Sequence, residues 1–438
     1  MKHCYLTILL FTSLFAQAQN PIIPNQGIND PHIRVFNNKA YLSASHDTSI
    51  DNDKFIMEDW TLWSSDDLRS WKLESVLKPE DTYIGKPFSS CWATDIAYRN
   101  GKYYWYFSEG NQRAGVVVAD SPTGPWTDPL GMPLLISELT PTHEYDMGII
   151  ETGGEYYLVF GVWDYYIARL NEDMISLAEA PRKIVVKDPQ GPYGIGKLDD
   201  KPFIHQRNGL FYLSWGCFYA MSNDLYGPYE YKGTVIDSTS FVGGLESPTW
   251  PHGPLQGRHG SFFDWHNQSY FAYCDISQTG NRYFRDTFIS YVHYKENGEM
   301  AVIRVDLDGV GQYDGSKVIQ AEDYFESYGT TKQENNQGGF SVGAIDNGDY
   351  LIYPNIKGLN DKVEILIEYE ALEDCVIEVR ESHPSGTLLA EIAVKADESL
   401  AKATLRGEIE GVCLKFSDVK EKVNITIDSF AFSSHHFK

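Results

Sequence analysis

Apolar and polar residues alternate along most of the chain in short runs that end at turn residues, a pattern typical of β-strands. The stretch from Asp30 to Asp47 shows the pattern clearly. An acidic residue precedes an apolar run from His32 to Phe36, which is followed by an Asn37-Asn38 turn and a return run from Ala40 to Ser45. Two runs joined by two turn residues predict a β-hairpin whose first strand opens on a carboxylate.

The same hairpin pattern recurs four more times, over residues 95–110, 146–164, 200–220 and 259–275. A tyrosine on each return strand marks the spacing. The steps are 63, 53, 55 and 58 residues between Tyr41, Tyr104, Tyr157, Tyr212 and Tyr270. Such uneven steps do not suit a solenoid, but they fit one four-stranded sheet per repeat. We therefore expect five sheets arranged radially as a five-bladed β-propeller.

Each predicted hairpin opens on a residue that can carry charge: Asp30, Asp95, Asp146, Asp200 and His259. In a propeller, the innermost strands begin around one central axis, so these side chains should converge on a single pocket. Buried charges are costly unless they are paired or used. Their repetition therefore favours a functional pocket over a propeller that serves only as a scaffold for other proteins.

The repeat pattern stops near residues 309–315, and a different pattern begins at Val318. Short alternating strands without helical periodicity follow at Asp349–Tyr353, Val363–Tyr369, Cys375–Arg380, Val412–Phe416 and Val423–Ile427. They predict a β-sandwich of the jelly-roll type. The predicted organisation is all-β, with a propeller over residues 19–315 and a sandwich over residues 316–438, because the length exceeds that of a single-core domain.

The first 18 residues have the composition of a secretory signal peptide. Lys2 and His3 precede an apolar run from Tyr5 to Phe15, and Ala16-Gln17-Ala18 forms a small-residue cleavage site. A buried helix of the mature fold is the alternative interpretation. No later run approaches the ~18 apolar residues of a membrane span. We therefore expect a secreted or periplasmic monomer.

The formal net charge of −25 argues against nucleic acid and anionic membranes as partners, and it fits a neutral substrate. Five cysteines remain beyond residue 18, an odd number with no short spacing between them. This count argues against a disulfide framework and against a zinc site. Cys375 and Cys413 could pair in the sandwich, or both could remain free thiols.

The five hairpins, with the Asn29-Asp30-Pro31 start and the Arg258-His259-Gly260-Ser261 opening of the fifth, resemble glycoside hydrolase family 43 over about residues 25–315. This resemblance implies a five-bladed propeller that hydrolyses glycosidic bonds with inversion. The C-terminal segment, with Ala321-Glu322-Asp323-Tyr324 and Ile427-Asp428-Ser429-Phe430, resembles carbohydrate-binding module family 6.

Inverting hydrolysis needs a basic carboxylate and a protonated carboxyl about 6.5 to 9.5 Å apart. The resemblance implies that Asp30 is the base and that Asp146 orients the acid and keeps its pKa raised. The acid departs from the family pattern, because Asp200-Lys201-Pro202 stands where family members have Glu-Gly-Pro. An Asp side chain is one methylene shorter than Glu. Glu246, in the long loop before the fifth hairpin, is therefore the second candidate for the acid.

Five further residues are candidates for contact with a substrate. Asp95 is expected either to contact substrate or to have a structural role. The family has a histidine near the axis that holds a water or a calcium ion, which implies a ligand role for His259; a core histidine is the alternative. Arg285 could pair with carboxylates or sugar hydroxyls. Trp92 and Trp163 could stack on a sugar ring, or pack between blades.

In the second domain, the resemblance implies that Glu322 and Asp428 hold a structural calcium ion. A stacking aromatic is missing at Ala344, so sugar binding in the usual loop cleft is not expected there. No cofactor is expected for catalysis.

The leading prediction is a glycosidase of the arabinofuranosidase, xylosidase or galactosidase type, acting on plant or algal polysaccharides or oligosaccharides. The alternative is a carbohydrate-binding propeller that has lost its acid.

Overall fold

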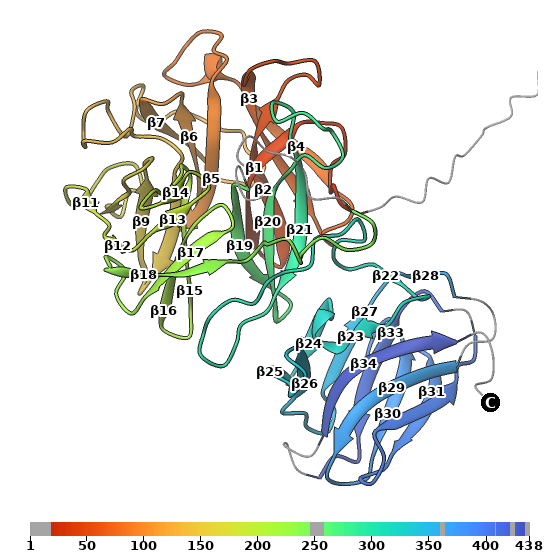
Figure 1. Cartoon of the computed structure of the whole chain (residues 1–438). Coiled ribbons are helices and arrows are strands. Elements are labelled where there is room, and N and C mark those ends of the chain that lie inside the picture. The colour runs from red at the N-terminus through yellow and green to blue at the C-terminus, as the bar shows by residue number, and fades with distance from the viewer. Residues whose placement is uncertain (1–18, 246–257, 360–363, 408, 421–424, 434–438) are drawn as a thin grey trace, which may run out of the picture.

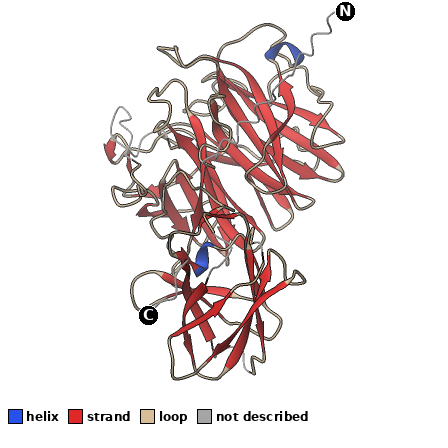
Figure 2. Cartoon of the chain, turned by 90° about the vertical axis from the view of Figure 1, so that its right-hand side faces the viewer, coloured by secondary structure: helices blue, strands red, loops and turns tan. Residues whose placement is uncertain are grey.

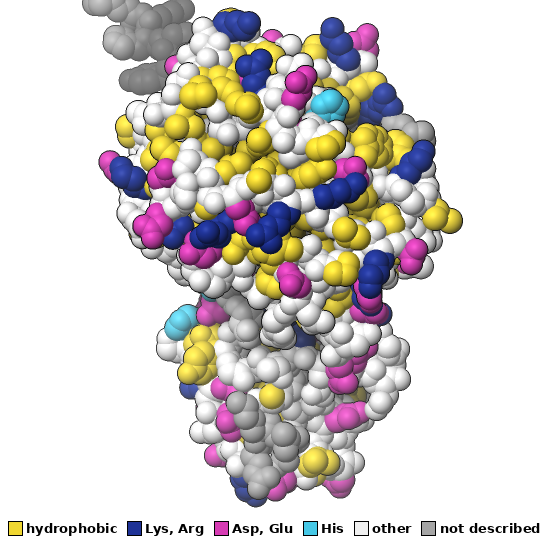
Figure 3. Space-filling model, turned by 90° about the vertical axis from the view of Figure 1, so that its left-hand side faces the viewer, with side chains coloured by type: hydrophobic (Ala, Val, Ile, Leu, Met, Phe, Trp, Pro, Cys, Tyr) yellow, Lys and Arg dark blue, Asp and Glu magenta, His cyan; other side chains and the backbone are white. Residues whose placement is uncertain are grey.

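The computed structural model describes residues 19–245, 258–359, 364–407, 409–420 and 425–433. Strands dominate this part of the chain, and its helices are two short 3-10 turns, η1 (Pro79–Asp81) and η2 (Ala321–Asp323). The all-β prediction is confirmed. The sheets form two lobes, a larger N-terminal lobe and a smaller C-terminal lobe (Figures 1 and 2). The molecule narrows between the lobes on the face that Figure 3 shows.

The N-terminal lobe contains five successive antiparallel sheets. The first comprises β1 (Ile28–Phe36), β2 (Lys39–Asp47), β3 (Met57–Ser65) and β4 (Lys72–Leu77). The second comprises β5 (Cys91–Arg99), β6 (Lys102–Glu109) and β7 (Arg113–Ala119). The third comprises β8 (Gly148–Thr152), β9 (Glu155–Phe160), β10 (Tyr166–Arg169) and β11 (Arg182–Lys183).

The fourth sheet comprises β15 (Pro202–Arg207), β16 (Leu210–Trp215), β17 (Phe218–Ser222) and β18 (Tyr229–Thr234), with β12 (Val186–Lys187) added in parallel beside β18. The fifth comprises β19 (Gly260–Trp265), β20 (Gln268–Asp275) and β21 (Asp286–Val292). A short hairpin, β13 (Gln190–Gly191) and β14 (Gly194–Ile195), precedes the fourth sheet.

The five sheets follow one another around a common centre. Their first strands contact one another in the order β1, β5, β8, β15 and β19, and β19 contacts β1 in turn. Hydrophobic cores fill the spaces between neighbouring sheets. Between the fifth sheet and the first, Ile33 and Leu42 pack with Tyr270 and Ile289. This circular packing brings the beginnings of the first strands together, although they are far apart in the sequence.

The C-terminal lobe is a sandwich of two sheets around a single core. One sheet has the order β25 (Thr331–Glu334), β26 (Phe340–Gly343), β34 (Ile425–Ser433), β29 (Glu364–Ala371) and β32 (Leu400–Thr404), with β23 (Ile319–Gln320) paired to β34. The other has the order β24 (Glu326–Tyr328), β27 (Tyr350–Tyr353), β33 (Val412–Ser417), β30 (Cys375–Glu381) and β31 (Leu388–Val394). β22 (Tyr313–Asp314) pairs with β28 (Ile356–Lys357).

A partly buried network of charged groups joins the two lobes. Asp323, in η2, accepts a bond from Nε2 of His293 at 3.0 Å and pairs with Nη1 of Arg304 at 3.1 Å. Lys332 donates to Nδ1 of His293 at 3.0 Å, and it also bonds Gln268 of the N-terminal lobe. Burial and the Lys332 charge lower the pKa of His293 to about 4. The lobes are therefore joined by fixed polar contacts.

Two further predictions concern the cysteines and the membrane. Cys375 and Cys413 are both buried, and neither forms a disulfide, which leaves the second of the two alternatives. Within the described ranges, the structure has no helix with the length and hydropathy of a membrane span. The proposed signal peptide lies outside the described residues.

Candidate active site

The strand registers show which residues occupy equivalent positions in the five hairpins. The five marker tyrosines pair with Arg34, Ala97, Ile150, His205 and Phe263 on the first strands. The residues four positions before these partners are Asp30, Ala93, Asp146, Lys201 and His259. The predicted alignment of the openings is therefore corrected in two sheets. Lys201 takes the opening position of the fourth sheet, and Asp200 comes one residue earlier. Asp95 lies two residues further into β5, which has a bulge.

Asp30 lies in a β-bulge at the start of β1. The pairing with β2 jumps from Asn29 to His32, so Asp30 and Pro31 stand opposite a single residue. The backbone of Asp30 is left-handed, with φ of 47°. Bulges redirect side chains and are frequent beside active sites. This bulge turns the Asp30 side chain towards the centre of the ring of sheets, where residues of the first and fifth sheets contact it.

Arg285, His259 and Ser45 make the shortest side-chain contacts to the Asp30 carboxylate. Oδ1 accepts hydrogen bonds from Nη1 of Arg285 and Nδ1 of His259, each at 3.0 Å, and Oδ2 accepts one from the Ser45 hydroxyl at 2.8 Å. Burial alone would raise the pKa of Asp30, but the charges of Arg285, Lys201 and His259 outweigh it and hold the pKa well below its usual range. Asp30 is therefore ionised, as a general base must be.

Arg285 is fixed in turn by a carboxylate that the sequence did not single out. Its guanidinium bonds both oxygens of Asp47, at 3.0 and 3.1 Å, and it also donates to Asn29. Burial raises the pKa of Asp47 to about 6, although Arg285 opposes the shift. Asp47 is the last residue of β2, and no motif in the sequence around it distinguishes it from other acidic residues at strand ends. Only the packing of β2 against the segment before β21 shows that it orients Arg285.

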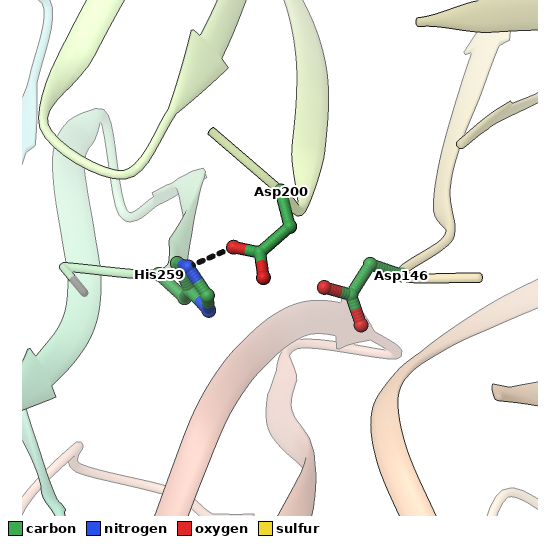
Figure 4. A group of neighbouring side chains, drawn as sticks. All are labelled: Asp146, Asp200 and His259. Carbon is green, nitrogen blue, oxygen red and sulfur yellow. Dashed lines mark ion pairs between the residues drawn. The ribbon is translucent and has the colours of Figure 1, made fainter. Parts of the chain in front are cut away.

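Asp146 and Asp200 lie close together and face one another (Figure 4). One oxygen of each, together with a ring nitrogen of His259, falls within a mutual distance of 4.8 Å. Asp146 is buried, and its backbone N–H donates to the Ser108 hydroxyl at 2.9 Å. Burial, followed by the Asp200 charge, raises the pKa of Asp146 well above its usual range. Burial and this neighbouring charge favour the protonated form of Asp146.

His259 bridges two of these carboxylates. Its Nδ1 lies 3.0 Å from Asp30 Oδ1, and its Nε2 lies 2.5 Å from Asp200 Oδ1. Burial opposes protonation, but Asp200 and Asp30 raise the pKa of His259 well above its usual range, so the ring is an imidazolium. The Asp30 and Asp200 carboxylates therefore lie beside the same imidazole ring, each next to a different ring nitrogen.

Asp95 lies away from any surface that a substrate could reach. It is fully buried, accepts bonds from Arg34 and from the backbone N–H of Ile149, and pairs with His32. Although burial opposes ionisation, the Arg34 and His32 charges lower the pKa of Asp95. Of the two roles expected for this residue, the geometry agrees with the structural one, in which Asp95 ties the first three sheets together.

The two predicted stacking residues lie on different sheets. The Trp92 ring meets Phe55 edge to face at 6.4 Å, and its Nε1 donates to Asn111. Trp163 is 50% exposed and meets Tyr193, of the β13–β14 hairpin, at 5.0 Å. The Trp163 backbone N–H donates to the carbonyl of Asp199, so the backbone of Trp163 lies beside the segment that carries Asp200. Glu246 lies outside the described residues.

The two residues predicted to hold calcium are neighbours in the C-terminal lobe. Glu322 follows β23 and Asp428 lies in β34, where Gln320 pairs with Ser429. Oε2 of Glu322 is buried and has no hydrogen-bond partner among the described residues, whereas Asp428 accepts a bond from Asn335 at 2.8 Å. Burial and the neighbouring acids Asp323 and Asp428 raise the pKa of Glu322 to about 8. A buried carboxylate oxygen with no hydrogen-bond partner in this part of the chain, next to a second acid, is a suitable site for a bound cation.

Comparisons with known proteins identify the family of this chain. The family model described as Glycosyl hydrolases family 43 matches residues 18–300. A xylosidase/arabinosidase of Bacteroides ovatus is 27% identical over 339 residues, which are 64% of this chain and 96% of that protein. An arabinoxylan arabinofuranohydrolase of Paenibacillus polymyxa is 26% identical over 396 residues, covering 76% of this chain and 60% of that protein.

A solved structure resembles both lobes together. The glycoside hydrolase family 43 arabinoxylan arabinofuranohydrolase of Bacillus subtilis, solved in complex with cellotetraose, is 20% identical and covers 96% of this chain and 98% of its own, with a TM-score of 0.56. This likeness concerns the fold. The family model spans well over half of the sequence, and the resemblance to this family found in the hairpins is confirmed. The chain belongs to glycosyl hydrolases family 43, and it is a glycosidase.

Proposed function

We propose that the five sheets are the blades of a five-bladed β-propeller and that the enzyme hydrolyses glycosidic bonds with inversion at its centre. The observation that carries this proposal is that Asp30, Asp146 and Asp200, far apart in the sequence, meet around His259. Inverting glycosidases hold the base and the acid about 6.5 to 9.5 Å apart, whereas retaining ones hold their two carboxyl groups about 5 to 5.5 Å apart. The wider gap leaves room for a water molecule beside the anomeric carbon.

In this mechanism Asp30 is the general base. Its carboxylate removes a proton from the attacking water as the bond to the anomeric carbon forms. Arg285 and His259 keep Asp30 ionised, and Ser45 fixes its second oxygen. These contacts also set the direction from which the water is activated, because a carboxylate that is bonded on several sides cannot rotate freely.

Asp200 is the proposed general acid, and Asp146 is its partner. The side chain of Asp200 is 29% exposed, whereas that of Asp146 is buried, so Asp200 is the group that a leaving oxygen can reach. Two carboxyls this close cannot both ionise freely, and the pair therefore holds the proton that the leaving group needs. Glu246 is the alternative acid.

The proposed substrate is a plant polysaccharide, or an oligosaccharide derived from one, that carries arabinofuranosyl or xylosyl residues. The support comes from the names of the relatives, a xylosidase/arabinosidase and an arabinoxylan arabinofuranohydrolase. Trp92 and Trp163, which lie on different sheets, would contact sugar units of the substrate. A galactosidase activity also belongs to the predicted class. Assays on a panel of substrates distinguish the arabinofuranosidase, xylosidase and galactosidase activities.

The C-terminal lobe is proposed to be a module like carbohydrate-binding module family 6, with a structural calcium ion bound by Glu322 and Asp428. When bound, the ion would neutralise the buried Glu322 carboxylate and would join η2 to β34 near the two ends of the sandwich. We further propose that the enzyme acts outside the cytoplasm as a monomer, which the signal-like residues 1–18 support.

The test compares the native enzyme with the Asp30→Asn variant in activity assays on aryl α-L-arabinofuranosides and aryl β-D-xylosides. We expect the native enzyme to release the sugar with inverted anomeric configuration, seen by proton NMR within the first turnovers. We expect Asp30→Asn to remain folded and to lose at least a factor of about 10³ in kcat, because the variant cannot activate water. Retention of configuration, or full activity of Asp30→Asn, would refute the mechanism.

A further inference from the structure

We propose that Lys201 and Cys274 are positioning residues that hold the general base in place by clamping the peptide groups on either side of Asp30. This inference rests on the proposed role of Asp30 and deepens it. Lys201 opens the fourth sheet and Cys274 lies in β20 of the fifth, so the clamp comes from two sheets that do not contain the base.

The backbone of Asp30 needs such a clamp. Its φ of 47° lies in the left-handed region, which residues with a Cβ rarely adopt. The next residue is Pro31, and a residue before proline favours an extended conformation. Both preferences oppose the observed conformation. A strained residue of this kind persists only where the surrounding structure determines its conformation.

The bulge also leaves the polar backbone groups of Asp30 outside the ladder between β1 and β2. Both are buried, and a buried backbone group must find a partner. The Asp30 N–H donates to Sγ of Cys274 at 3.1 Å, and its carbonyl accepts a bond from Nζ of Lys201 at 2.5 Å. These partners lie 244 and 171 residues away in the sequence. The two bonds hold the peptide groups of the base from opposite ends.

Cys274 also contacts the carboxylate of the base. Its thiol lies 3.6 Å from Asp30 Oδ1 and donates to it, while the sulfur accepts the Asp30 N–H. Burial, followed by the Asp30 charge, raises the pKa of Cys274 to about 12. The sulfur therefore stays protonated and can act as donor and acceptor at once. A thiolate in this position would repel Asp30.

Lys201 is itself held in an unfavourable state. It is fully buried, its φ is 52°, and it precedes Pro202. Glycine adopts this backbone conformation without steric cost, so a lysine there needs a compensating interaction. The bond to the Asp30 carbonyl is that interaction. A buried ammonium at the centre of the sheets also acts on Asp30 through its charge, in addition to its hydrogen bond.

The charged and titratable groups around the clamp come from all five sheets. Asp30 interacts with Arg285, Lys201, His259, Cys274, Asp47 and Asp146, and Lys201 interacts with Asp30, Cys274, Asp146, Asp95 and His32. Burial lowers the pKa of Lys201, and the surrounding carboxylates oppose that shift. The Lys201 charge in turn lowers the pKa of Asp30. Removing the Lys201 charge should therefore raise the pKa of Asp30. Because the base must be ionised, the acidic limb of the pH–rate profile should then move to higher pH.

The test uses Lys201→Met, which keeps most of the stem but removes the ammonium. We expect kcat on an aryl glycoside to fall 10- to 100-fold with KM changed less than threefold. The apparent pKa that defines the acidic limb of the kcat/KM profile should rise by at least half a pH unit. Lys187→Met is the matched control, since Lys187 is an exposed lysine of the fourth sheet that pairs with Glu230 at 3.3 Å. It should leave both quantities unchanged.

The cysteine half of the clamp is tested by a pair of variants. Cys274→Ala removes donor and acceptor and should lower kcat at least fivefold, with KM retained. Cys274→Ser keeps both functions and should recover most of that loss. A role in packing alone predicts that Ala and Ser behave alike, or that Ser is the worse of the two. Equal activity of the two variants would therefore overturn this half of the proposal.

The results for the Lys201 variants distinguish failure of the clamp proposal from failure of the proposed role of Asp30 as the base. If Asp30→Asn is inactive while Lys201→Met is folded and keeps native kcat and the native acidic limb, the clamp is wrong and the base is right. If Asp30→Asn is fully active, the proposed function itself fails. Should Lys201→Met not fold, Lys201→Gly repeats the test without backbone strain. Failure of both variants to fold would make Lys201 a residue of the core and would overturn the proposal.

Discussion

Replacing Asp146 with Asn tests whether two neighbouring carboxyls share the catalytic proton. The relevant oxygens of Asp146 and Asp200 lie within 4.8 Å. At that distance, and with an effective dielectric constant of about 20, two negative charges repel by about 3 to 4 kcal/mol. This energy corresponds to about 2 to 3 pKa units. Without the Asp146 carboxylate this repulsion is lost.

The measurement is the pH dependence of kcat/KM on two substrates. We expect the alkaline limb of Asp146→Asn to move about 2 to 3 units lower, with a loss near neutral pH of about 100-fold on a natural oligosaccharide. The loss should be smaller on an aryl glycoside with a good leaving group, because that bond needs less protonation. Asp120→Asn is the control, since the Asp120 side chain is 86% exposed. An alkaline limb that does not move would refute the shared proton.

Four further predictions concern the acid, the contact between the lobes, the pH dependence of stability and the metal. Asp200→Asn and Glu246→Gln should differ, because only loss of the true acid is partly rescued by a better leaving group. Asp323→Asn should lower the free energy of unfolding by about 1.5 to 3 kcal/mol, measured in urea. For His293, whose pKa falls from 6.5 to about 4, the unfolded state binds more protons, so stability should fall as pH drops through that window. Chelation by EDTA should lower the melting temperature of the C-terminal lobe without changing kcat on an aryl glycoside, if Glu322 helps to hold calcium; an unchanged melting temperature contradicts the site.

The period of two in the hydrophobic pattern identified the hairpins because each strand is buried on a face that side chains reach alternately. β1 and β2 contain the two predicted runs, and they meet at the predicted Asn37-Asn38 turn. The strands expected in the C-terminal lobe appear as β27, β29, β30, β33 and β34, with ends that differ by a few residues. Repetition also located Asp30 and Asp146, because each stands four residues before the strand position that faces its marker tyrosine.

The sequence alone determined the all-β class, the number of hairpins and the family resemblance, since these depend on local alternation and short motifs. The tertiary structure decided which side chains meet. A bulge and left-handed residues shift the register by one or two positions, so Lys201 rather than Asp200 opens the fourth sheet, and Asp95 is enclosed between the first three sheets. Arg285 reaches Asp30 from 255 residues away. A pattern with a period of two carries no information about such contacts, because they arise only when the last sheet packs against the first.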